Sequence, residues 1–383
     1  MSLRAEIVEH MADIDAAEWG ALAADENPFL SHAFLETLEY CRCVGGDTGW
    51  YPHHLVVRDP RGRLIAAMPQ YLKQHSWGEF IFDWSWAQAS TRAGIEYYPK
   101  LLSAVPFTPV TGPRMLIRGD ADRGAMQREL PDLLKEAARS IGASGAHVNF
   151  TTAEEQAALE AAGFARRHDC RFLWRNRNYR NFDDFLERMR SDKRKKVRRE
   201  RRRVVENGIS IRTLAGEDLP TKTWEQVFGF SEQTFLRHGM SHYLNPSFFE
   251  RLARLQPGTV MVKVAEQGGK PRATAIFLQG GGALYGRYWG SDEYLDCLHF
   301  ELCYYQGIEH SIEMGLSSFD PGTQGEHKLA RGFEPTVTTS AHWLAHEGLA
   351  NAIRRHLERE RAAVDEYVAT ASSHMPFKRG EAS

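Results

Sequence analysis

The sequence has few cysteines, no long uncharged segment and almost no net charge. Its five cysteines include no Cys-x-x-Cys pair, which excludes the ordinary zinc-ribbon and thioredoxin patterns. The longest uncharged stretches, such as 273–286, have 14 residues, whereas a membrane-spanning helix needs about 20. The 48 Lys and Arg residues nearly balance 50 Asp and Glu residues, so the whole chain is not a basic nucleic-acid coat. We expect a cytoplasmic protein with no membrane span and no secretory signal.

Two familiar catalytic motifs are also missing. The sequence contains no Gly-x-Ser-x-Gly, so it lacks the nucleophile elbow of the α/β-hydrolases. Its 16 histidines include no His-Glu-x-x-His spacing. We therefore expect structural or surface histidines and no bound metal.

The chain repeats itself at an offset of 169 residues. Four pairs share this offset without gaps: Phe150 and Phe319, Gly163 and Gly332, Phe164 and Phe333, Trp174 and Trp343. Each block reads as a strand, a short variable segment, Gly-Phe and a second strand ending at Trp. This pattern predicts an internal duplication.

Hairpins and helices precede each block. Turn residues at 60–62 and 268–269 predict hairpins over 53–69 and 260–278. Helices are expected at 125–141 and at about 299–314. The predicted class is α/β with mixed sheets, arranged as two similar units. We expect domains at 1–176 and 208–346, a basic linking helix within 177–207, and a terminal helix with a frayed tail over 347–383.

The linking segment is strongly basic. Residues 188–203 hold 11 Lys and Arg and two acids, Asp192 and Glu200, for a charge of +9. The absence of Pro and Gly within this segment favours a helix that ends at Gly208. Three interpretations remain open: a solvated helix between domains, a surface that binds the phosphates of RNA or a nucleotide, and a nuclear-type or membrane-surface signal.

Residues 75–114 and 321–344 carry a family resemblance. Together they resemble the FemAB-like predicted N-acyltransferases, which are similar to a tandem duplication of the GNAT acyltransferase fold. The likeness covers about residues 25–360. It implies an N-acyltransferase related to the Fem enzymes, which move an amino acid from aminoacyl-tRNA to an amine of a cell-wall precursor. The segment 107–113 is similar to their Pro-x-x-Gly-Pro, and Lys328 ahead of Gly332–Phe333 is similar to their lysine ahead of Phe-Gly.

The acyl donor is an aminoacyl-tRNA or an acyl-CoA. An acetyl-CoA enzyme of the GNAT type holds the pyrophosphate with a glycine-rich loop at a helix N-terminus. Neither helix expected here has such a loop. At the second helix, residues 292–301 contain four acids and no glycine. Before the first helix, Gly119 and Gly124 are far apart, and Asp120 and Asp122 lie between them. This absence favours aminoacyl-tRNA as the donor. No other cofactor is predicted.

The loop after Phe319 is the predicted catalytic segment. It contains two glycines, followed by Glu326, His327 and Lys328. Lys328 could stabilise an oxyanion, and Glu326 or His327 could accept a proton. The equivalent loop of the first copy, 151–155, lacks the glycines, so the copies have diverged here. A structural turn with solvated side chains is the alternative.

Two further groups predict substrate binding. Cations and aromatic rings alternate in the first copy, which suits an anionic acceptor; the alternative is a lid whose tyrosines fill a core. The predicted residues there are Arg92, Tyr97, Tyr98, Lys100, Thr111 and Arg114. In the second copy, strand alternation places Tyr285 and Arg287 on one face. Asp320, the first residue after the strand at 316–319, completes the predicted set.

The predicted function is transfer of an acyl or aminoacyl group to an amine on a polar, anionic acceptor of small-molecule or cell-wall type. A CoA-dependent N-acyltransferase is the first alternative. A non-catalytic protein that binds RNA or a nucleotide through 188–203 is the second, and tRNA is the partner expected for that segment.

Overall fold

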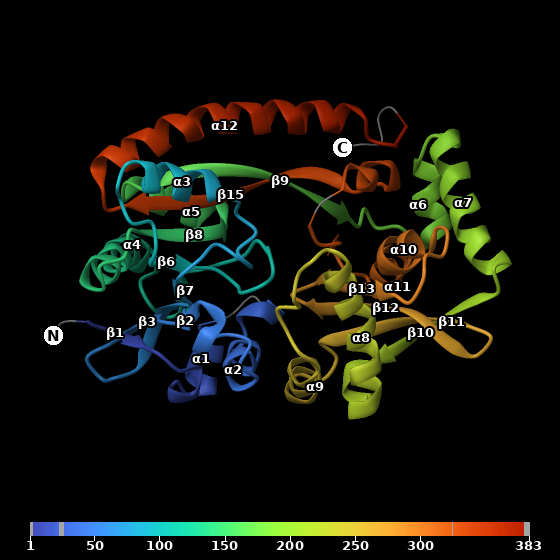
Figure 1. Ribbon diagram of the computed structural model, residues 1–383, viewed down its shortest axis with the longest axis horizontal. Helices are drawn as coiled ribbons and strands as arrows, with labels where there is room; N and C mark the ends of the chain where they lie inside the picture. Colours follow the sequence, from blue (N-terminus) through green and yellow to red (C-terminus); the bar gives the residue numbers. More distant parts are fainter. Residues whose placement is uncertain (1–2, 23–26, 324, 379–383) are drawn as a thin grey trace. The chain divides into compact units, whose positions relative to one another are not determined.

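The computed structural model describes residues 3–22, 27–323 and 325–378. The chain divides into two compact units, each of mixed helix and sheet (Figure 1). Unit 1 comprises Met1–Asp169 and Val337–Glu366, and unit 2 comprises Cys170–Thr336 and Tyr367–Ser383. The predicted α/β class is confirmed.

Unit 1 contains two sheets. The first has the order β1 (Arg4–Val8), β3 (His54–Arg58), β4 (Leu64–Met68) and β7 (Leu116–Ile117). The second has the order β15 (Glu334–Leu344), β8 (Gly145–Thr151), β6 (Lys100–Ser103), β5 (Tyr71–Lys73) and β2 (Trp50–Pro52), with β6 and β8 parallel. The helices of this unit are α1 (Ala16–Gly20), α2 (His32–Tyr40), α3 (Trp84–Arg92), α4 (Arg123–Ser140), α5 (Ala153–Ala161) and most of α12 (Glu347–Ser373).

Unit 2 contains one sheet flanked by helices. The strand order is β10 (Ile209–Ala215), β11 (Val260–Gln267), β12 (Lys270–Gly280), β13 (Ala283–Ser291), β14 (Ser318–Asp320) and β9 (Ala165–Arg175), with β13 and β14 parallel. The helices are α6 (Phe182–Arg188), α7 (Ser191–Glu206), α8 (Thr221–Arg237), α9 (Pro246–Leu255), α10 (Leu298–Phe300) and α11 (Gln306–Glu313). A π-helical turn over 301–305 joins α10 to α11, and 326–331 form a 3₁₀ helix, η6 (Glu326–Arg331).

Helices cover both faces of the unit 2 sheet. On β12, Thr274 donates a hydrogen bond to the carbonyl oxygen of Val227 in α8. The next residue, Ala275, belongs to the buried cluster that includes Ile308 of α11. Since successive strand residues point to opposite faces, α8 and α11 lie on opposite sides of the sheet.

The two predicted hairpins are confirmed. Strands β3 and β4 flank the turn that contains Gly62, and β11 and β12 flank Gly268–Gly269. Both glycines of the second turn have positive φ, 59° and 73°, as a two-residue hairpin turn requires.

The 169-residue offset recurs in the structure. Strands β9 and β15 begin and end at residues separated by this number, and β8 ends at 151 while β14 ends at 320. Gly163 and Gly332, which precede β9 and β15, have nearly identical φ values of 90° and 89°. Phe164 and Phe333 are both buried. The final strands and the Gly-Phe turns of the duplicated blocks therefore correspond, whereas the segment before the turn forms the α-helix α5 in the first copy and a 3₁₀ helix over 326–331 in the second.

The units divide inside β9 and β15, whereas the expected boundaries followed these strands at 176 and 346. Residues 339–344 of β15 pair with β8 in unit 1. Trp174 and Arg175 of β9 pair with β14 in unit 2. Each copy thus contributes the end of its last strand to the sheet of the other copy's unit. The sequence repeat does not indicate which strands pair with one another.

The linking segment and the tail also differ from expectation. Helix α7 begins at Ser191 rather than Arg188, and its end is followed by Gly208 with φ 69°. The sequence predicts a frayed tail after the terminal helix, but α12 continues to Ser373 and the side chains of Met375 and Phe377 are buried. The backbone N–H of Arg190 donates to the carbonyl oxygen of Pro376 at 2.9 Å. Apolar burial therefore fixes 374–378; the last five residues of the predicted tail lie outside the described range.

Among the described helices, none has a segment that is long and apolar enough to cross a membrane.

Candidate active site

Unit 2 contains a cavity of about 320 Å³ beside the parallel pair β13 and β14. Its walls come from α8, β12, β13, the start of α10, the π-helical turn and the loop that follows β14. The lining residues with chemical interest are Arg287, Trp289, His299, Tyr304, Gly322 and Thr323. The cavity therefore borders the loop that the sequence predicts as catalytic.

A β-bulge interrupts the pairing of β12 with β13 beside the cavity. Ile276 pairs with Tyr288, but the next residue, Phe277, pairs with Gly286, so Arg287 is an additional residue on β13. A bulge interrupts the ladder and re-aims the side chain at the extra position. The Arg287 guanidinium donates to Oδ2 of Asp320 at 3.0 Å and lies 5.2 Å from the centre of the Tyr285 ring. The predicted group Tyr285, Arg287 and Asp320 is therefore brought together.

Asp320 is the anionic centre of this group. Burial alone would raise its pKa, but the charges of Arg287 and Arg171 and a backbone hydrogen bond from Gly322 hold the pKa well below its usual range. The Gly322 N–H lies 2.9 Å from Oδ1 of Asp320. A permanent carboxylate thus fixes both Arg287 and the beginning of the loop.

Lys328 lies behind the same loop. Its side chain is buried, and Nζ donates to the carbonyl oxygens of Gly322 at 2.8 Å and Thr323 at 3.1 Å. Burial lowers the pKa of Lys328 to about 7; Asp320 opposes this shift, and Arg171 and Arg287 reinforce it. Burial therefore favours the neutral amine of Lys328 far more than in a solvated lysine, and the side chain is attached to two carbonyls of the cavity wall.

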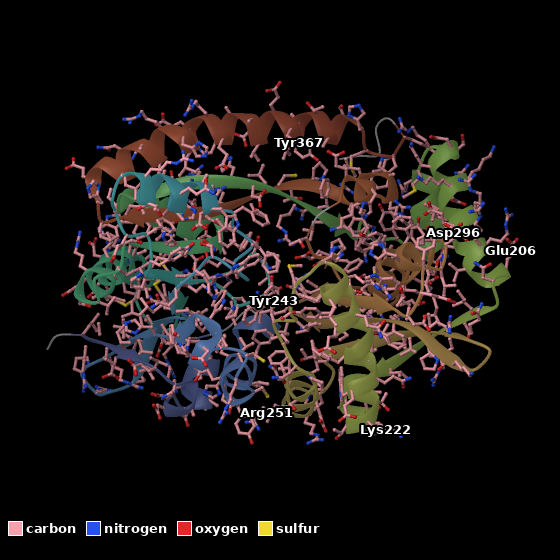
Figure 2. The ribbon with its side chains drawn as sticks, in the orientation of Figure 1. Glu206, Lys222, Tyr243, Arg251, Asp296 and Tyr367 are labelled. Carbon is pink, nitrogen blue, oxygen red and sulfur yellow. The ribbon has the colours of Figure 1, made fainter. Side chains whose placement is uncertain are left out.

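Glu326 and His327 are the first two residues of η6. Glu326 is exposed and accepts a hydrogen bond of 3.1 Å from Tyr367, which is labelled in Figure 2. Nε2 of His327 lies 2.8 Å from the hydroxyl of Tyr304. Burial, together with Arg331 and Lys328, lowers the pKa of His327. None of the three predicted catalytic residues is among the described residues that line the cavity, because the chain turns at Gly325 with φ 107° into η6.

His299 is a cavity residue that the sequence prediction missed. Burial lowers its pKa to about 4, and the charges of His327, Lys328 and Arg331 add to this shift. Its ring lies 5.1 Å from that of Trp289, and it forms no hydrogen bond with any side chain or backbone group in the described part of the chain. Burial therefore favours the neutral form of the His299 imidazole, which lines the cavity.

The residues predicted in the first copy separate into two sets. Lys100, Tyr97 and Tyr98 are brought together around Asp83 and Ser76: Tyr97 donates to Asp83 at 2.6 Å, and the Tyr98 hydroxyl lies 2.8 Å from Ser76. Lys100 is fully buried and donates to Glu79, Asp83 and Ser76. These contacts favour the alternative of tyrosines that fill a core.

The other three residues lie elsewhere. Arg92 is exposed at the end of α3, and Thr111 is exposed in a loop. Arg114 is completely buried, and its guanidinium donates to the carbonyl oxygens of Val110, Gly112, Pro113 and Asn149. Its donors therefore bind the backbone of its own unit, which is a structural role rather than recognition of an anion.

A second lysine belongs to the buried network of unit 1. Lys73 lies 3.6 Å from the centre of the Trp50 ring and 3.9 Å from Glu79. Burial lowers the pKa of Lys73 to about 6 and raises that of Glu79 to about 7. Lys100 keeps a raised pKa because Glu79 and Asp83 outweigh its desolvation. The network is therefore anchored by the ion pair of Lys100 with Asp83.

The fold is similar to that of several solved structures. FemX has 13% identity and a TM-score of 0.53, with coverage of 92% of this chain and 100% of FemX. The C-terminal domain of a putative lysylphosphatidylglycerol synthetase from Agrobacterium fabrum has 12% identity and a TM-score of 0.54, with coverage of 90% and 95%. L-PGS from Bacillus licheniformis has 12% identity and a TM-score of 0.53, with coverage of 90% and 97%. The chain therefore shares its fold with these three structures.

A family model identifies the group of proteins to which the chain belongs more specifically than the fold does. The model of the FemAB-like family, described as peptidoglycan biosynthesis/recognition, matches residues 10–379. The chain belongs to the FemAB-like family, as its sequence motifs predict. No curated protein sequence matches the chain.

Proposed function

We propose that this protein is an N-acyltransferase that moves an aminoacyl group from aminoacyl-tRNA to an amine of a polar, anionic acceptor at the unit 2 cavity. The observation that carries the proposal is the composition of that cavity. It combines a β-bulge arginine held by Asp320, a neutral His299 and a loop attached to Lys328.

The reaction requires a neutral amine that attacks an ester carbonyl. The amine nitrogen forms a bond to the acyl carbon, and the carbonyl oxygen becomes an oxyanion. The amine's proton passes to a base, the bond from carbon to the ester oxygen breaks, and that oxygen leaves with a proton. His299 is the proposed base, because it is neutral and lines the cavity. Arg287 is the proposed group for the acceptor's anion or the oxyanion, since it is a cationic residue that lines the cavity.

Lys328 then has a positioning role. Its Nζ atom faces the carbonyls of Gly322 and Thr323 rather than the cavity. It holds the loop whose backbone borders the substrate. His327 acts through Tyr304, which lines the cavity, and Glu326 has no part in the proposed chemistry.

Two observations favour aminoacyl-tRNA over acyl-CoA as donor. The surface of α7 forms a hollow lined mainly by cations: Lys193, Lys195, Lys196, Arg198, Arg199 and Arg202. Such a row suits a phosphate backbone. In contrast, α10 follows an acidic segment in which Asp296 pairs with Arg203, so the approach to this helix is unsuited to a pyrophosphate. The family description supports a cell-wall-type acceptor.

A transfer assay tests the proposal. The acceptors are synthetic peptidoglycan-precursor peptides with one free side-chain amine, and the donors are total tRNA charged with labelled amino acids and, separately, acetyl-CoA. We expect peptide labelling from aminoacyl-tRNA that is lost when the peptide amine is acetylated beforehand. Labelling from acetyl-CoA alone would support the CoA-dependent alternative. Binding of tRNA without transfer from either donor would support a non-catalytic RNA-binding protein.

A further inference from the structure

Helix α7 has two chemically different faces. Its outer face holds the cations of the hollow described above. Its inner face holds Val197, Val204 and Glu200, all buried. Glu200 is the only acid between residues 193 and 203. A single carboxylate buried on an otherwise basic helix needs a compensating partner.

That partner is Arg331, the last residue of η6. Its guanidinium donates from one nitrogen to both carboxylate oxygens of Glu200, at 2.8 and 2.9 Å. Arg331 also donates to the Tyr305 hydroxyl at 3.0 Å, and it lies 3.4 Å from the centre of the Phe300 ring. Tyr305 in turn donates to Glu200. Glu200 additionally lies 4.0 Å from Nζ of Lys196, a residue of the basic hollow.

The same arginine reaches the loop of the proposed active site. A third donor of Arg331 bonds the carbonyl oxygen of His327 at 2.8 Å. His327 precedes Lys328, whose Nζ holds Gly322 and Thr323 in the cavity wall. Hydrogen bonds therefore connect the inner face of α7 through Glu200 and Arg331 to His327, and the adjacent residue along the backbone, Lys328, hydrogen-bonds the cavity wall.

We propose that Glu200 and Arg331 form a positioning pair that couples anion binding on the outer face of α7 to the loop at 320–328. The inference rests on the proposed function, since it names how the donor's phosphates act on the proposed active site. The cations that would contact a phosphate backbone lie on the same rigid helix as Glu200. Any shift of α7 on binding is therefore transmitted through a buried ion pair to η6, which carries Lys328.

A neighbouring ion pair provides the control. Arg201, the next residue of α7, donates to Glu301 at 3.1 Å and to Glu309 at 2.8 Å. This pair also attaches α7 to the helices of unit 2, but its hydrogen bonds go to 301 and 309 and not to η6. Arg201 is not among the residues that line the basic hollow. Loss of either pair removes an attachment of α7, but only loss of Glu200 removes the connection to the loop.

The experiment compares Glu200→Gln with Arg201→Gln in the full-length protein. Hydrogen exchange of the peptide containing 325–333 is measured without ligand and with uncharged total tRNA as the probe. In Glu200→Gln we expect about a tenfold faster exchange of this peptide without ligand, and no tRNA-induced protection, while tRNA affinity changes less than twofold. Arg201→Gln should match the wild type in the exchange rate of this peptide without ligand and in its protection by tRNA. Glu200→Asp should restore part of the protection.

Kinetics provide the second readout. Where transfer from aminoacyl-tRNA is measurable, Glu200→Gln should lower kcat about tenfold with an unchanged KM for the donor. The pair is merely structural if Glu200→Gln and Arg201→Gln alter loop exchange and kcat equally. Absence of transfer in the wild-type protein contradicts the proposed function but leaves the ligand-free exchange comparison decisive for the positioning pair.

Discussion

The Nζ atom of Lys328 lies 2.8 Å from the carbonyl oxygen of Gly322, a residue in the wall of the unit 2 cavity. The lysine therefore holds the loop through its backbone carbonyls and is not itself among the described residues that line the cavity. Without Lys328 its two partner carbonyls would lose a hydrogen-bond donor, which costs free energy. This relationship determines how substitutions of Lys328 should behave.

We predict that Lys328→Met lowers turnover about 100-fold, because small displacements of positioning groups have effects of this order. The assay is acyl transfer, measured beside a thermal melt. Lys263→Met is the matched control: Lys263 is another buried lysine of unit 2, with Nζ 2.7 Å from Thr213 and a pKa that burial lowers. Equal losses of turnover in the two variants would contradict a specific role for Lys328.

The pKa of Lys328 also predicts a pH dependence of stability. Burial lowers this pKa from 10.5 to about 7, so between these values the unfolded chain binds more protons at this site than the folded chain. The contribution of Lys328 to the free energy of unfolding therefore increases with pH across this window. Urea unfolding of wild type and Lys328→Met should show a difference that moves in favour of the wild type from pH 7 to pH 10. A pH-independent difference would contradict the lowered pKa.

The buried network of unit 1 predicts a structural phenotype. Lys100→Met should lower the free energy of unfolding by about 3–5 kcal/mol, since it leaves Asp83 and Glu79 buried without their main cation. Arg92→Ala should change it by less than about 0.5 kcal/mol, because this side chain is exposed. Chemical denaturation measures both. A stable Lys100→Met protein that has lost acceptor binding would instead restore the substrate-binding interpretation.

The basic hollow predicts a salt-dependent affinity for tRNA. Changing Lys195, Lys196 and Arg199 to Gln should weaken binding and reduce the slope of log affinity against log salt by about 0.7–0.9 for each phosphate that the variant no longer neutralises. Arg203→Gln is the control, because Arg203 pairs with Asp296, labelled in Figure 2. Titrations at several salt concentrations give both slopes. An unchanged slope in the triple variant would exclude the hollow as the binding surface.

Much of the fold could be predicted because the two copies share a spacing. Gly163 and Gly332 mark the same turn with the same positive φ, and glycine is the residue suited to that conformation. The exchange of strand ends could not be predicted, since the alternation in β9 and β15 is compatible with pairing in either unit. The exact residues that pair depend on tertiary contacts.

The candidate site was only partly predictable. The loop after Phe319 stands out because its glycines are absent from the first copy. The role of Arg114 was not predictable, because its partners are backbone carbonyls, which any sequence supplies. Lys100 was predicted to bind substrate because it is a cation near aromatic rings in the sequence. In the structure it forms ion pairs with Glu79 and Asp83, about 20 residues earlier in the chain. The cavity that His299 lines is bordered by the bulge in β13 and by a π-helical turn, and neither feature has a reliable sequence signal.

His299 gives the most direct test of the proposed chemistry. As a neutral base in the cavity, it should contribute about 10²–10⁴-fold to turnover, so His299→Gln should lose activity by that factor with little change in melting temperature. His310→Gln is the matched control: burial also lowers the pKa of His310 to about 4, but this histidine contacts Gln279 and is not among the described residues that line the cavity. Below pH 6 kcat/KM should fall in both proteins, because the acceptor amine becomes protonated. The wild type should fall more steeply as the pH approaches 4, since only the wild type also protonates His299. If both variants keep full turnover, the proton acceptor lies elsewhere, and His327, connected to the cavity through Tyr304, becomes the next residue to substitute.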